Sequence, residues 1–188
     1  VIQILSACIL TRGVKIDTLA TFDIEYLFLN IRAKSVGETI KLNILCPDDE
    51  KTNVEMDIDI DSIKVKKDKN HKNTIKLDDN LSLKLKYPSM SQFIESNFET
   101  GEETIGNTME VITSCIDMIY NEEESWSASD VSKNEIEDFI DQLNTKQFRL
   151  IEDFFSTMPK LTHRIKVKNP KTEVESTVVL EGLAAFFN

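Results

Sequence analysis

Apolar and polar residues alternate strictly in several stretches of the chain, a pattern that predicts half-buried antiparallel strands. The clearest stretches are residues 40–44 and 54–60, which lie on either side of Cys46–Pro47. Shorter runs of the same period follow at residues 75–85 and again at 165–180. The sequence therefore predicts a β-hairpin near each end of the chain, each with a turn that contains a proline.

Elsewhere, apolar residues recur three or four positions apart, which predicts amphipathic helices. We expect a first helix at residues 1–10 and a second at 17–34, which should end before Gly37. Glycine favours a helix end because it adopts left-handed backbone angles without a steric cost. A third helix should start at Ser89 or Ser91.

Residues 89–158 are expected to form helices, with a polar link at residues 122–126. The spacing of apolar residues predicts a helix over residues 104–120, and Ser132 with Glu135 forms a capping box at the start of the next one. In a capping box the hydroxyl and the carboxylate satisfy free N–H groups of the first helical turn. The last helix of this region should end before Pro159, because proline cannot continue a helix.

Charge is distributed unevenly and divides the chain into three regions. Residues 89–158 carry 16 acidic and 3 basic side chains, whereas the whole chain carries 33 and 22. We therefore expect N-terminal helices with antiparallel hairpins at residues 1–88, an acidic helical region at 89–158, and a C-terminal hairpin with a short helix at 159–188. The predicted fold class is α+β.

The two proline turns resemble zinc-ribbon knuckles that have lost their metal ligands. A knuckle holds zinc through two thiolates of a Cys-Pro-x-Cys tip. The first turn keeps only Cys46, with Asp49 at the second thiol position, and the second turn has Asn169 and Thr172 instead. Because a structural zinc needs four ligands, we expect metal-free hairpins that are held together by their apolar faces.

Five segments, taken in order, resemble one known family. They are residues 21–38 (TFDIEYLFLNIRAKSVGE), the Cys46–Pro47 hairpin, the acidic strand at 57–61, and residues 158–163 and 180–187. Together they span most of the chain, and they resemble the T4-like phage baseplate hub assembly protein family. Some relatives carry Cys-Pro-x-Cys at both tips, and this chain departs from them there.

The resemblance implies a myovirus tail protein that takes part in baseplate hub assembly in the host cytoplasm. Its partners would be other hub or tail proteins. The resemblance leaves two alternatives open: an assembly factor or chaperone that leaves the particle, and a permanent structural subunit of the virion tail baseplate.

Composition disfavours several other partners. The net charge of −11 disfavours binding to nucleic acids and to anionic lipids, because a protein that binds either one neutralises phosphates with Lys and Arg. No apolar run approaches the roughly 18 residues that a membrane-spanning helix needs. With five glycines in all, the chain offers no Gly-rich phosphate loop, and we expect no cofactor. Three cysteines that lie far apart are typical of a reducing compartment.

Few residues are candidates for catalysis. The chain has two histidines, His71 in a lysine-rich loop and His163 on a predicted strand, and neither lies near a nucleophile motif. A hub-associated hydrolase would need a pocket that gathers His163 with carboxylates. The acidic residues at 57–61 lack the Gly and Glu of an EF-hand loop, which favours a solvated strand face over a calcium site. The sequence therefore predicts a non-enzymatic protein.

Protein–protein recognition is the expected activity, and aromatic side chains are common anchors of such contacts. Neighbouring aromatics on a helix point in different directions, so one member of Phe154–Phe155 and of Phe186–Phe187 can face a partner. The alternative is that both pairs fill the core. The candidate contact residues are Phe22, Tyr26, Arg32, Trp126, Phe155, Phe186 and Phe187. The acidic region is either a partner-steering face or a surface that confers solubility.

Overall fold

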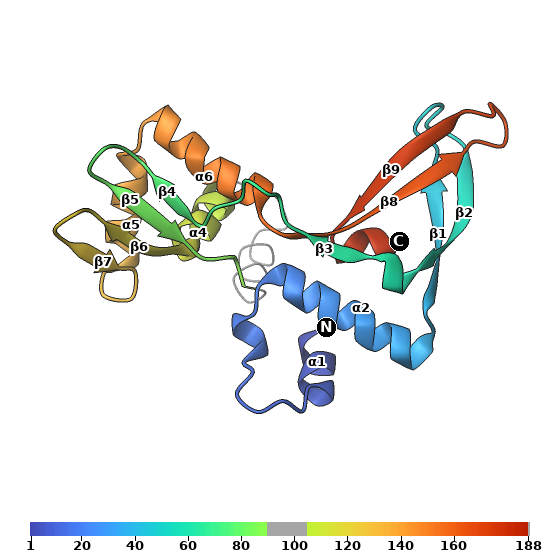
Figure 1. Cartoon of the computed structure of the whole chain (residues 1–188), viewed down its shortest axis with the longest axis horizontal. Helices are drawn as coiled ribbons and strands as arrows, with labels where there is room; N and C mark the ends of the chain where they lie inside the picture. The colour runs from blue at the N-terminus through green and yellow to red at the C-terminus, as the bar shows by residue number, and fades with distance from the viewer. Residues whose placement is uncertain (90–104, 188) are drawn as a thin grey trace. The chain divides into compact units, whose positions relative to one another are not determined.

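The computed structural model describes residues 1–89 and 105–187, except for the side chains of residues 105–107 (Figure 1). The chain forms two compact units, each assembled from segments that are distant in sequence. Unit 1 comprises Val1–Ile16, Phe22–Lys66 and the residues from Pro159 onward, and unit 2 comprises Asp17–Thr21 and Lys67–Met158. Both units combine helices with antiparallel strands, so the predicted α+β class is confirmed.

Unit 1 contains helices and two small antiparallel sheets. Its elements are α1 (Ile2–Cys8), α2 (Thr21–Val36), β1 (Thr39–Leu45), β2 (Asn53–Asp59), η2 (Ile60–Ser62), β3 (Lys64–Lys66), β8 (Lys160–Lys168), β9 (Glu175–Glu181) and η3 (Leu183–Phe186). Strands β1 and β2 form one sheet, and the other has the order β3-β8-β9. The two predicted hairpins therefore belong to separate sheets.

One apolar core joins the two sheets of unit 1 to helix α2. The side chains of β1 alternate between exposed and buried along the whole strand, as its sequence pattern predicts. The core receives side chains from α2, β1, β2, β8 and η3, among them Leu29, Leu42, Ile58, Leu161 and Phe186. A two-stranded hairpin is marginally stable by itself, so the β1–β2 sheet depends on this shared core.

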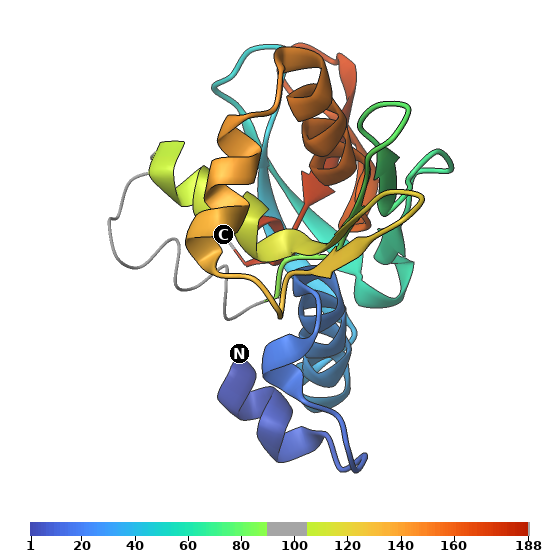
Figure 2. The ribbon, with the colours of Figure 1, turned by 90° about the vertical axis from the view of Figure 1, so that its left-hand side faces the viewer.

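Unit 2 contains a four-stranded antiparallel sheet of order β4-β5-β6-β7. Its elements are η1 (Ile16–Thr18), β4 (Thr74–Lys76), β5 (Ser82–Leu85), α4 (Ile105–Cys115), β6 (Ile116–Tyr120), β7 (Ser125–Ser127), α5 (Lys133–Asp141) and α6 (Thr145–Thr157). Helices α4, α5 and α6 lie on one side of the sheet (Figure 2). Between them is a second apolar core, which includes Leu83, Leu85, Ile116, Ile140 and Ile151.

His71 is buried in unit 2, where both of its ring nitrogens have hydrogen-bond partners. Nδ1 lies 3.0 Å from Thr157 Oγ1, and Nε2 lies 3.0 Å from the Tyr87 hydroxyl. Thr157 donates its own proton to the Asp153 carbonyl at 2.6 Å, so its oxygen accepts from Nδ1–H and Nε2 accepts from Tyr87. The ring also packs against Phe154, at 5.1 Å between centroids. Burial lowers the pKa of His71, which favours the neutral imidazole.

Two predicted helix ends are found as expected. Ser132 Oγ accepts from the Glu135 N–H at 3.3 Å, while the Glu135 carboxylate accepts from the Ser132 N–H at 2.8 Å. These two bonds form the capping box that starts α5. Helix α2 ends at Val36, directly before Gly37, whose φ of +133° few other residues adopt.

The prediction that residues 89–158 form helices joined by a polar link at 122–126 was wrong in part. Helix α4 ends at Cys115, and the chain continues at once as strand β6 rather than as helix to Tyr120. The spacing of Ile112, Ile116 and Ile119 fits a helix face, but pairing with β5 and β7 overrides it. The helix expected to start at Ser89 or Ser91 falls almost entirely outside the described residues.

The compact units group the chain differently from the three charge-based regions. Residues 67–88 pack with the acidic centre in unit 2, and the residues from Pro159 onward pack with the N-terminal hairpin in unit 1. Part of the lysine-rich stretch at 64–76 is also ordered as strands, since β3 pairs with β8 and β4 pairs with β5. Strand pairing thus brings together segments that local charge separates.

We expect the stability of the protein to fall as the pH drops from about 7.5 to about 5, because of His71. The pKa of the folded state is lowered, so only the unfolded state takes up the proton just below its ordinary pKa of about 6.5. The contribution of His71 to the free energy of unfolding is therefore fully present above that pH and decreases as the pH falls below it. Thermal unfolding followed by circular dichroism at the two pH values measures the effect.

The variant His71→Phe keeps the ring packing but has no titrating group. It should unfold more easily at neutral pH, by about 1–3 kcal/mol, because two hydrogen bonds are lost. Its pH dependence should be weaker than that of the wild type. His163→Gln, which removes the other histidine, should keep the full dependence, and an equal loss of dependence in both variants would contradict the assignment.

Candidate interaction sites

Helix α2 holds the C-terminal segment of unit 1 in place through a half-buried hydrogen bond. The Glu25 carboxylate accepts from the Leu183 N–H at 3.1 Å, at the start of η3. Burial raises the pKa of Glu25, and this backbone bond opposes the shift. Phe186, three residues further on, is fully buried in the core of unit 1. These two attachments leave the next residue, Phe187, at the surface.

Phe187 and Arg32 form part of the wall of a pocket on unit 1. The guanidinium carbon of Arg32 lies 5.5 Å from the centre of the Phe187 ring, within the range of a cation–π contact. The ring of Phe28 meets Phe187 edge-on at 5.9 Å. The pocket has a volume of about 670 Å³ and is lined by Arg32, Thr39, Ile40, Lys41, Leu42, Asp57, Phe186 and Phe187. It combines aromatic and aliphatic walls with charged groups.

A hydrogen-bonded cluster joins the tips of the β1–β2 and β8–β9 hairpins. We name it the tip clasp; it consists of Asp48, Asn169 and Thr172. The Asn169 amide donates to both Asp48 carboxylate oxygens, at 3.1 and 3.0 Å, and the Thr172 hydroxyl donates to one of them. The Thr172 bond and then the Asn169 bond keep the pKa of Asp48 below its ordinary value. The clasp therefore links two separate sheets at their far ends.

The two tips also share one backbone turn. The Cys46 carbonyl accepts from the Glu50 N–H at 3.0 Å, and the Asn169 carbonyl accepts from the Glu173 N–H at 2.9 Å. Glu50 and Glu173 both have left-handed backbone angles, with φ of +53° and +61°. Cys46 and Asn169, at the first position of each turn, are both buried. The likeness between the hairpins thus extends to the turns where a knuckle would carry its ligands.

Asp49 stands at the second thiol position of the first tip, and its carboxylate accepts hydrogen bonds within its own turn. Its carboxylate accepts from the Thr52 hydroxyl at 2.6 Å, from the Thr52 N–H at 3.0 Å and from the Lys51 N–H at 3.1 Å. These bonds hold the pKa of Asp49 far below its ordinary value. In the described part of the chain, no three His, Cys, Asp or Glu side chains are grouped so that they could hold a metal ion.

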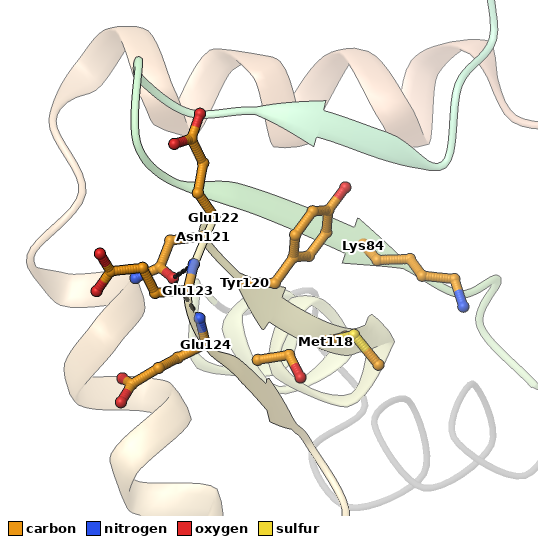
Figure 3. A pocket seen from close by; sticks show the side chains of 8 residues that line it. Lys84, Met118, Tyr120, Asn121, Glu122, Glu123 and Glu124 are labelled. Carbon is orange, nitrogen blue, oxygen red and sulfur yellow. Dashed lines mark hydrogen bonds between the residues drawn. The ribbon is translucent and has the colours of Figure 1, made fainter.

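The turn between β6 and β7 forms a shallow acidic hollow on unit 2 (Figure 3). The Asn121 carboxamide accepts from the Glu123 and Glu124 N–H groups, at 2.8 and 2.6 Å, and so shapes the turn. The side chains of Glu122, Glu123 and Glu124 spread outward in different directions, away from Lys84 (Figure 3). Divergent carboxylates do not converge on a reacting atom, so the hollow is suited to contact with a basic surface rather than to catalysis.

His163 lies near a hydroxyl in an arrangement that does not activate it. Its Nδ1 is 3.5 Å from Ser62 Oγ, but the Ser62 hydroxyl donates to the Asp59 carbonyl at 2.5 Å. Among the described residues, no hydrogen bond or ion pair joins His163 to a carboxylate. A general base needs the nucleophile's proton directed at it and a third group to orient it. The buried Cys115 thiol is also unreactive, because burial raises its pKa to about 11.

The seven contact candidates fall into three groups by exposure. Phe22 and Phe186 are buried, so neither is available to a partner in this structure. Tyr26, Arg32 and Phe155 are half-buried. Trp126 and Phe187 are exposed, at 39 % and 44 % of their surface. Arg32, Phe186 and Phe187 meet at one pocket, whereas Trp126 and Phe155 belong to unit 2.

Sequence reasoning did not identify the tip clasp as a contact. It noted Asn169 and Thr172 as substitutes for thiols, but it did not pair them with Asp48, which lies more than 120 residues away. The available signal was the repeated Pro turn, because the two tips of a knuckle pair lie together around one metal ion. Asp48 occupies the x position of the first turn, directly before Asp49.

The fold and these surfaces define an α+β protein of two units whose distinctive features are contact surfaces and buried hydrogen bonds. No helix in the described part of the chain is both long and apolar enough to cross a membrane. The family model described as T4 bacteriophage base plate protein matches residues 1–188. The chain therefore belongs to this family, which confirms the resemblance to T4-like baseplate proteins. Neither the curated proteins nor the solved structures gave a significant match.

We expect Asp48→Ala to destabilise unit 1 by removing the acceptor of the tip clasp. The buried Asn169 amide would then lose its partner, and a buried unsatisfied donor is costly. The thermal midpoint should fall by roughly 2–8 °C. Glu175→Ala, which removes an exposed carboxylate from β9, is the control and should leave the midpoint nearly unchanged; equal effects would contradict a specific role for the clasp.

We also expect the triple variant Asp49→Cys, Asn169→Cys, Thr172→Cys to bind one zinc ion together with the native Cys46. The shared turn geometry places these residues at the four ligand positions of paired knuckles. Zinc should raise the thermal midpoint of the variant and leave the wild type unchanged. A matched variant with Cys46→Ala in addition should bind far more weakly. Stoichiometry above or below one zinc per chain would show that the tips do not form a common site.

Proposed function

We propose that the protein is a non-enzymatic assembly factor that acts as a chaperone in building the baseplate hub of the phage tail. It would work in the host cytoplasm through contacts with other hub or tail proteins. The observation that carries the proposal is the match of the whole chain, residues 1–188, to the baseplate family. The match supports a role connected with the baseplate, and assembly is the specific role that we propose.

The surface chemistry supports recognition as the mechanism. Trp126 and Phe187 are large exposed aromatics, the type of residue that commonly anchors an interface. Residues 89–158 carry a large excess of acidic side chains, which would steer a basic partner toward unit 2. Such long-range attraction sets association rate and orientation, while aromatic contacts supply affinity.

The second candidate is a permanent structural subunit of the virion baseplate, which the same family match supports equally. The third, a hub-associated hydrolase, has His163 as its best residue. The described bonds of Ser62 and His163 favour the non-enzymatic reading. His163→Ala should leave both tail assembly and infectivity intact, whereas loss of infectivity in fully assembled particles would favour the hydrolase.

Purified virions separate the first two candidates. An assembly factor should be absent from the proteins of the mature particle, although it is present in infected cells. Quantitative mass spectrometry of both samples makes the comparison. Detection at a fixed number of copies per particle would favour the structural subunit.

We expect the tagged full-length protein to recover baseplate proteins from infected cells and Trp126→Ala to recover at least about tenfold less, since loss of an aromatic anchor often costs that much affinity. Leu150→Ala is the matched control, because Leu150 lies in the same unit and is 37 % exposed, close to the 39 % of Trp126. Equal recovery by both variants would exclude Trp126 as an anchor. Recovery of no tail protein by the wild type would count against the assembly role.

A further inference from the structure

The outer face of the β3-β8-β9 sheet carries a row of cations. Ile165 and Val167 of β8 are buried in the core of unit 1, so the residues that alternate with them point to the opposite side of the sheet. Arg164, Lys166 and Lys168 are exposed on that side. We name these three residues the basic ladder.

Further lysines extend this positive face. The register of β3 against β8 places Lys64 and Lys66 on the same side as the basic ladder, with Lys66 directly opposite Lys160. Like charges directly opposite each other destabilise a sheet. Among the described residues none of these cations forms an ion pair, whereas Lys41 of β1 lies 3.1 Å from the Glu55 carboxylate. Unit 1 therefore carries a positive face on a chain whose net charge is −11.

The outer face of the β1–β2 hairpin has the opposite charge. Glu55, Asp57 and Asp59 of β2 are exposed in succession on one side of the strand, and we name them the acidic ladder. The cation on this face is Lys41, which Glu55 already engages. Side chains on one face of a strand follow each other at about 6.8 Å. The acidic and basic ladders therefore have the same spacing and opposite sign.

Each face also exposes one aliphatic side chain, and their positions define an orientation. Leu45 is 49 % exposed at the end of β1 next to its tip, and Val179 is 44 % exposed on β9, opposite Arg164 and away from its tip. The tip clasp holds both tips at the same end of unit 1. Two copies stacked with their tips in opposite directions would therefore bring Leu45 of one copy to Val179 of the other, while the acidic ladder covers the basic ladder.

We propose that unit 1 is a self-association module, in which the β1–β2 face of one copy docks on the β3-β8-β9 face of a second copy. The equal spacing and opposite charge of the two ladders select a second copy as the occupant. Nucleic acid fits this face less well, because Glu175 and Glu181 of β9 lie beside the basic ladder and would repel phosphates. The inference does not rest on the assembly role.

The proposed contact joins two different faces, so each bound copy keeps one free face of each kind. Such a heterologous contact does not close at two copies, and association continues to rings or open chains. Exposed ion pairs contribute little free energy, so the contact should be weak and sensitive to salt. These two properties distinguish it from a symmetric apolar dimer.

Sedimentation equilibrium of the full-length protein tests the proposal. The average mass should rise with concentration from 21.5 kDa to more than twice that value, with a Kd on the order of 0.1 mM. Raising the salt concentration from about 0.05 M to about 0.5 M should weaken the association at least about fivefold. A monomer at every concentration up to about 0.5 mM, a mass that stops at two copies, or association that salt does not weaken would overturn the proposal.

Two charge-reversed variants test the pairing of the faces. One carries Arg164→Glu and Lys166→Glu, and the other carries Glu55→Lys and Asp57→Lys. Each variant alone should be monomeric, because its two faces no longer have opposite charge. An equimolar mixture should associate again, because the unaltered faces of the two variants match each other and so do the altered ones. If the mixture stays monomeric although circular dichroism shows both variants folded, the proposal is wrong.

A matched control separates this pairing from the effect of net charge. Arg12→Glu with Lys146→Glu changes the net charge as much as the basic-ladder variant does, at exposed positions outside both faces, and should associate like the wild type. The milder single variants Lys166→Gln and Asp57→Asn should each weaken association at least about twofold. Equal loss in the control, or saturable binding of a poly-dT oligonucleotide that the basic-ladder variant abolishes, would overturn the proposal.

Discussion

The structure of unit 1 depends on covering the apolar faces of two small sheets, one of them a hairpin that is marginally stable alone. Strand β1 buries every second side chain, and β8 and β9 supply Leu161, Val167 and Leu180 to the same core. Helix α2 adds Leu29 between them. Sharing one core lets five short strands and a helix behave as one body. The positions of the pocket and of the tip clasp both follow from this arrangement.

Hydrogen bonds occupy the place that metal would take in a zinc-ribbon protein. In a knuckle pair, one cation satisfies four thiolates at once, whereas here Asp48 accepts from an amide and a hydroxyl of the opposite tip. Such bonds need no metal supply and do not depend on the redox state of thiols. They are also local and directional, so they fix the relative position of the tips. The tip clasp thus joins the two sheets of unit 1 through side-chain hydrogen bonds.

The sequence predicted most of the elements, because alternation and capping are local signals. The β1–β2 hairpin, the end of α2 before Gly37 and the capping box at Ser132 were all identified in this way. The change from α4 to β6 was missed, since isoleucines spaced by three and four fit a helix until strand partners are known. The burial of Phe22 and Phe186 and the pocket at Arg32 depend on distant segments meeting. Local patterns carry no information on such meetings.

The interruption of unit 1 by unit 2 has a consequence for biosynthesis. The ribosome releases residues 67–158 before β8 and β9, so unit 2 can close on itself while the β1–β2 hairpin still lacks part of its core. During this interval Leu42, Ile44 and Ile58 would face water, and a nascent chain in that state is prone to misassociation. Translation speed through the segment after Met158 would then influence the yield of native protein. The order of the segments along the chain thus delays completion of unit 1 until β8 and β9 have emerged from the ribosome.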